Sequence, residues 1–137
     1  MSLATTYYLS VMLASIGVLQ IIAVGSLFRS IQFVPNNVIA RLIGSMLIAL
    51  GFGLFFGSGP QHLPDTSGGL DGNSQASFFA LGSLTGILIT FLISSLINKN
   101  RYSCSDVTQN GLDILRKTTY LKAVFSLVKK QWTQLYR

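Results

Sequence analysis

Charge is scarce in this chain of 137 residues, and acidic residues are the scarcest of all. Only a tenth of the residues are charged, glutamate is missing, and no lysine precedes Lys99. Ordinary soluble domains carry about a quarter charged residues, whereas half of this chain is apolar. The composition therefore argues against a soluble globular domain and indicates an integral membrane protein.

Cysteine and histidine are almost absent as well, with Cys104 and His62 as single examples. One cysteine excludes an internal disulfide framework. Without CxxC or HxxxH spacing, the sequence offers no set of metal ligands. His62 and Asp65 lie close in sequence, but catalysis would also need a nucleophile and an orienting group. We therefore predict no catalytic residue, no metal, no cofactor and no enzymatic activity.

Three long apolar runs stand out against this background. They cover about residues 7–28, 38–57 and 77–97, and each is long enough to cross a hydrocarbon core of roughly 30 Å. A cleaved signal peptide would have a basic segment before its apolar run, and the first charge here, Arg29, follows the run. We therefore predict an all-α membrane protein whose residues 1–98 form a three-span domain, with Asn37 capping the second span.

Small residues recur at every fourth position in the second and third runs. Residues four apart share one face of a helix, and helices in lipid associate where small side chains let their backbones approach. We therefore predict that the second and third spans pack together as a hairpin. The residues predicted to make this helix-packing contact are Ser45, Ala49, Gly53 and Gly57 in the second span and Gly82, Gly86, Thr90 and Ser94 in the third.

The tail, residues 99–137, holds eight of the ten basic residues. Its apolar residues between 112 and 136, such as Phe125 and Trp132, fall on one face of a helix. A basic amphipathic helix is typical of a segment that lies in the membrane interface and is attracted to anionic headgroups. We predict such an interfacial helix at 112–136 and no nucleic-acid binding; docking of its apolar face on a protein partner is the alternative. The residues predicted to bind the membrane surface are Arg116, Lys122, Lys129, Lys130, Trp132 and Arg137.

No motif in the sequence assigns a function. We expect an accessory or assembly subunit of a larger membrane complex, docked by its basic tail and bound to other membrane subunits or to itself. The alternative is a small homo-oligomeric transporter or pore, with hydroxyls such as Ser10 and Thr90 along a path. Transport usually leaves ionisable groups within the spans, and only Arg41, near the start of the second span, meets that criterion.

The charges of the connecting segments alternate along the chain. Arg29 and Arg41 flank the first connector, the long loop before the third span holds Asp65 and Asp71 without a basic residue, and the tail is strongly basic. Basic segments favour the cytoplasmic side. We therefore predict that the N-terminus and the long loop lie outside, and that the tail lies on the cytoplasmic or equivalent side.

This topology predicts opposite accessibility for two engineered cysteines in a Cys104→Ser background. In sealed cells, Ser74→Cys should react with a membrane-impermeant maleimide, because the long loop and the start of the third span face outward. Ser126→Cys should react only after the cells are opened. The reverse pattern of labelling would mean that the topology is inverted.

Overall fold

Three long helices build the part of the chain that the computed structural model describes, which is residues 2–26, 28–58 and 70–99 with residues 119–121, 124, 125, 128, 129 and 132 of the tail. The helices are α1 (Leu3–Gly25), α2 (Asn37–Gly57) and α3 (Gly72–Ile97), and a short 3-10 turn, η1 (Arg29–Ile31), follows α1. All three are long and apolar enough to cross a membrane. The prediction of an all-helical chain with three helices long and apolar enough to span a membrane is therefore confirmed for the described residues.

Polar side chains begin each helix by capping its free backbone N–H groups. Asn36, rather than the predicted Asn37, caps α2: its side-chain oxygen accepts from the N–H of Val38 at 2.9 Å, and Asn37 is already helical. Asp71 caps α3 and accepts from the N–H of Ser74 at 2.6 Å, which holds the pKa of its carboxyl below the ordinary value. This cap therefore stays charged at neutral pH and weakens only when the pH falls through that lowered pKa.

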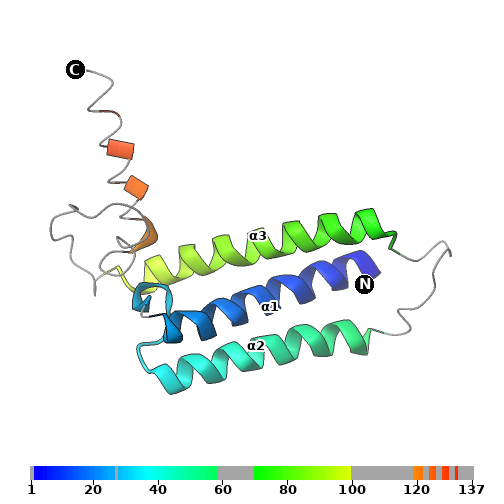
Figure 1. Cartoon of the computed structure of the whole chain (residues 1–137), viewed down its shortest axis with the longest axis horizontal. Coiled ribbons are helices and arrows are strands. Elements are labelled where there is room, and N and C mark those ends of the chain that lie inside the picture. The colour runs from blue at the N-terminus through cyan, green and yellow to red at the C-terminus, as the bar shows by residue number, and fades with distance from the viewer. Residues whose placement is uncertain are drawn as a thin grey trace.

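The order of the helices in space differs from the order along the chain. Figure 1 shows α1 in the middle, with α2 on one side and α3 on the other. Both α2 and α3 have extensive contacts with α1, and none of comparable extent joins α2 to α3 among the described residues. The predicted pairing of the second and third spans is therefore wrong, because the first span separates them.

Glycines on both helices bring α1 and α2 into backbone contact. A Cβ atom added at Gly17 would lie 2.5 Å from the carbonyl oxygen of Gly44, and one added at Gly44 would lie 2.7 Å from that of Gly17. Further along, a Cβ at Gly51 would lie 2.7 Å from the carbonyl oxygen of Ser10. Distances this short leave no room for a side chain, so glycine is required where these two helices touch.

The small residues of α3 also lie at a helix contact, although their partner is α1. A Cβ at Gly82 would lie 2.9 Å from the carbonyl oxygen of Tyr8, and one at Gly86 would lie 2.8 Å from that of Met12. Thr90 and Ser94 continue this row and are buried. The row predicted on α3 is therefore a packing surface, and the prediction was wrong about the helix that it faces.

The row predicted on α2 lies on a different face from the one that meets α1. Ala40, Gly44 and Gly51 are the buried residues of this helix. Nothing lies within 4 Å of a Cβ added at Gly53 or Gly57. The four predicted residues, all exposed, are Ser45, Ala49, Gly53 and Gly57. Within a single chain this row packs on no other described helix.

We expect the substitutions Gly44→Ala and Gly53→Ala to have different effects on stability. A methyl group at Gly44 meets backbone atoms of α1, and such overpacking typically costs roughly 1–3 kcal/mol. A methyl group at Gly53 meets open space and gains up to about 1 kcal/mol of helix propensity. Thermal unfolding of the full chain in detergent, followed by circular dichroism, measures both. Equal effects of the two substitutions would contradict the observed contact.

Candidate functional site

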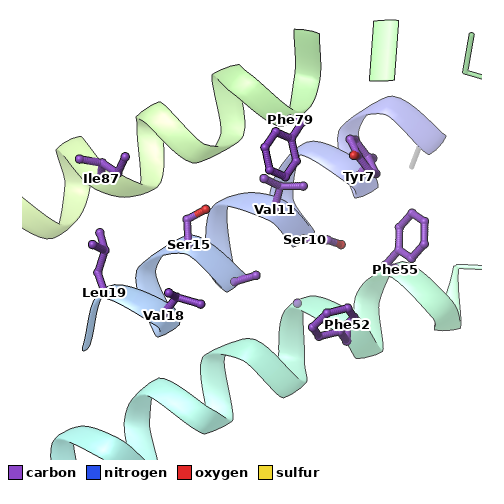
Figure 2. Close-up of a pocket in the computed structure, with 12 residues that line it drawn as sticks. Tyr7, Ser10, Val11, Ser15, Val18, Leu19, Phe52, Phe55, Phe79 and Ile87 are labelled. Atoms are coloured by element: carbon purple, nitrogen blue, oxygen red, sulfur yellow. The ribbon is translucent and has the colours of Figure 1, made fainter. Parts of the chain in front are cut away.

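An apolar groove with a volume of about 510 Å³ runs along α1 between α2 and α3 (Figure 2). The floor of the groove is one face of α1, and its two walls come from the neighbouring helices. The residues of α1 that line it are Tyr7, Ser10, Val11, Ala14, Ser15, Val18 and Leu19. The residues of the walls are Gly51, Phe52 and Phe55 on α2 and Phe79 and Ile87 on α3.

The two ends of the groove differ in chemistry. Figure 2 shows the aromatic rings of Tyr7, Phe55 and Phe79 at the end where α1 begins, and aliphatic side chains at the other. Tyr7 meets Phe55 edge to face, with ring centroids 5.7 Å apart. Phe52 stacks on Phe56 with ring centroids 6.2 Å apart, and Phe56 is not among the residues that line the groove. The rings therefore hold one another in place along the wall that α2 provides.

Among the described residues that line the groove, the only polar side-chain groups are hydroxyls. The Ser10 hydroxyl donates to the carbonyl oxygen of Thr6 at 2.7 Å, within its own helix. The hydroxyls of Tyr7 and Ser15 have no hydrogen-bond partner among the described residues. A lining of this kind, mostly apolar with two available hydroxyls, is suited to binding an apolar molecule.

A second feature is a cluster of buried polar side chains at the opposite end of the bundle. Gln20 is fully buried, and its amide nitrogen donates to the carbonyl oxygen of Ile31 at 3.3 Å. Its amide oxygen accepts from the N–H of Phe33 at 2.9 Å. One glutamine of α1 therefore fixes the connector that leads to α2.

Asn98, directly after α3, binds the same connector. Its amide nitrogen donates to the carbonyl oxygens of Ser30, at 3.1 Å, and of Gln32, at 2.8 Å. Asn98 is only 2% exposed, so these bonds form away from water. The connector is thus held by one amide side chain from α1 and by another directly after α3.

The beginning of the described tail packs beside this cluster. The N–H of Leu121 donates to the Ser95 hydroxyl at 3.2 Å, and the ring of Tyr120 stacks on Phe91 with centroids 4.5 Å apart. Thr119 is buried. The end of α3, the α1–α2 connector and residues 119–121 therefore meet at one end of the bundle.

Gln32 is the exception in this cluster. Its side chain is 2% exposed, and neither its amide nitrogen nor its amide oxygen has a hydrogen-bond partner among the residues that the structure describes. A buried polar group without a partner costs about 1–3 kcal/mol. Sequence reasoning missed Gln32 and Asn98, because the sequence does not reveal which polar residues flanking a span turn inward.

Most of the other residues singled out from the sequence lie at the surface or outside the described residues. Arg41 is exposed in the first turns of α2, and Lys129 and Trp132 are exposed in the tail. His62, Asp65 and Cys104 lie outside the described residues, as do Arg116, Lys122, Lys130 and Arg137. The amphipathic helix predicted at 112–136 also lies mostly outside them and stays a prediction. Among the residues described, no three of His, Cys, Asp or Glu are grouped closely enough to hold a metal ion.

The comparisons with known proteins do not assign the chain to a family. No protein-family model matches the chain, and no curated protein or solved structure matches it either.

We expect Asn98→Leu and Gln32→Met to differ in their effect on thermal stability. Asn98→Leu removes the donor to two buried carbonyl oxygens and should cost about 1–3 kcal/mol. Gln32→Met replaces two unpartnered polar atoms with apolar ones of similar length, so stability should stay equal or rise. Thermal unfolding in detergent measures the difference. A loss from Gln32→Met as large as that from Asn98→Leu would show that the Gln32 amide has a partner.

Proposed function

We propose that this chain is a small, non-catalytic accessory or assembly subunit of a larger membrane complex. The row Ser45, Ala49, Gly53 and Gly57 on α2 carries the proposal. Both α2 and α3 pack on α1, and the small-residue row on α3 lies at that contact. The row on α2, in contrast, is exposed in a single chain. Small residues on a spanning helix allow another helix to approach closely, so we assign this surface to a helix of a partner protein.

The proposal includes the orientation and the membrane-surface role derived from charge. Asn98 binds the α1–α2 connector, and Leu121 binds Ser95 near the end of α3, so the basic connector and residues 119–121 of the basic tail lie at the same end of the bundle. That arrangement supports placing both on the cytoplasmic or equivalent side. Val124, Phe125, Val128 and Trp132 are exposed, which supports a tail whose apolar side chains meet anionic lipid or a neighbouring subunit.

The test is affinity purification of the full chain from its native membrane in mild detergent, followed by native mass spectrometry. We expect the chain to co-purify with larger membrane proteins in a fixed stoichiometry. Gly53→Leu should remove those partners, because its branched side chain fills the α2 row. The thermal stability of the isolated chain should not fall, because nothing lies within 4 Å of that position.

Gly25→Leu is the matched control, since Gly25 also faces open space and lies outside the row. Equal loss of partners from both variants would contradict docking through the α2 row. A closed homo-oligomer without other proteins would favour the pore or transporter alternative. Ser10, Thr85, Thr90 and Ser94 each donate to a carbonyl oxygen of their own helix, so they do not favour that alternative.

A further inference from the structure

We propose that the groove between α2 and α3 binds one acyl chain of a membrane lipid, taken from the leaflet in which α1 begins. The proposal stands apart from the complex-subunit function, because it concerns a different face of the bundle. It rests on the length of the groove, on where it ends, and on the chemistry of its lining.

The length of the groove corresponds to one leaflet. Its lining on α1 runs from Tyr7 to Leu19, and the twelve steps between these residues, at a rise of about 1.5 Å each, give roughly 18 Å. The hydrocarbon core of a bilayer is about 30 Å thick, so one leaflet contributes about 15 Å. Tyr7 lies one turn after the start of α1, where tyrosine is favoured at the level of the headgroups. An acyl chain that enters beside Tyr7 and follows α1 therefore ends near Leu19.

The groove stops well short of the far end of the bundle. Ile22 follows Val18 on the same face of α1 and is 53% exposed, yet it does not line the groove. A membrane-spanning helix of a partner would need a contact surface close to 30 Å long. The groove offers little more than half of that length, which favours a chain from one leaflet over a spanning helix.

The lining matches a hydrocarbon chain. The lining has no charged residue. Phe52 on the α2 wall and Phe79 on the α3 wall are both 55% exposed, so each offers an aromatic surface to a bound chain. Aromatic and aliphatic side chains gain contact with methylene groups, and the free Tyr7 hydroxyl lies at the end where a polar headgroup would remain. Since no charged residue is among those that line the groove, the site recognises the chain rather than the charge of the headgroup.

Photocrosslinking with two lipids tests this proposal directly. The full chain is reconstituted into phosphatidylcholine bilayers that contain a phosphatidylcholine with a diazirine either near the head or near the end of one acyl chain. Mass spectrometry of peptides then locates the crosslinks. We expect the near-head probe to label the region of Tyr7 and Phe55, and the chain-end probe to label the region of Val18 and Ile87. Leu42 and Met46, on the exposed face of α2, should be labelled far less.

Two matched pairs of variants make the test specific. Val18→Phe fills the deep end of the groove and should lower chain-end labelling there by about tenfold, equivalent to about 1.4 kcal/mol. Val38→Phe, at a position 66% exposed outside the groove, should leave the labelling unchanged. Phe52→Ala should lower labelling more than Phe56→Ala does, because both remove the same stacked pair but only Phe52 lines the groove.

Three outcomes would overturn the proposal. Equal labelling of the groove and of the exposed face of α2 would mean ordinary boundary lipid only. Unchanged labelling in Val18→Phe would place the bound chain elsewhere. Labelling of the groove in reconstituted bilayers but not in native membranes would show that a protein segment occupies the groove. None of these outcomes changes whether partners co-purify through the α2 row, so failure here is distinguishable from failure of the proposed function.

Discussion

Direct contact between the backbone of α1 and the backbones of both neighbouring helices is the interaction on which the bundle depends. Gly17 and Gly44 allow it on one side, and Gly82 and Gly86 allow it on the other. Between lipid-embedded helices there is no hydrophobic driving force, so van der Waals contact at close range has to supply the stability. A methyl group at any of these glycines would separate the helices.

The buried polar cluster at one end of the bundle fixes the connection between α1 and α2, which the glycine contacts do not determine. Helix contacts fix how α1, α2 and α3 pack along their length, but not how the chain turns between α1 and α2. Gln20 and Asn98 fix that turn by binding its backbone N–H and carbonyl groups. Tyr120 and Leu121 pack at the same end of the bundle, so α3 positions this part of the tail.

The central place of α1 explains both surfaces to which we assign a partner. Because α2 and α3 flank α1 without meeting each other extensively, the face of α1 between them is left as the floor of a groove. For the same reason α2 meets the bundle through one face only, so its row from Ser45 to Gly57 is exposed. One surface is suited to a lipid chain and the other to a helix of another protein, and both follow from a single arrangement.

The sequence by itself determined the three helices and their approximate limits. In lipid a helix satisfies its backbone hydrogen bonds internally, so a long apolar run such as 38–57 is helical whatever lies beside it. The tertiary structure alone decided that α1 is central, that the α3 row meets α1, and that the α2 row is open. Pairing in lipid depends on matching shapes rather than on total apolarity, and all three spans carry small residues. The burial of Gln32 and Asn98 could not be predicted from the sequence either, because it depends on how the α1–α2 connector packs against the end of α3.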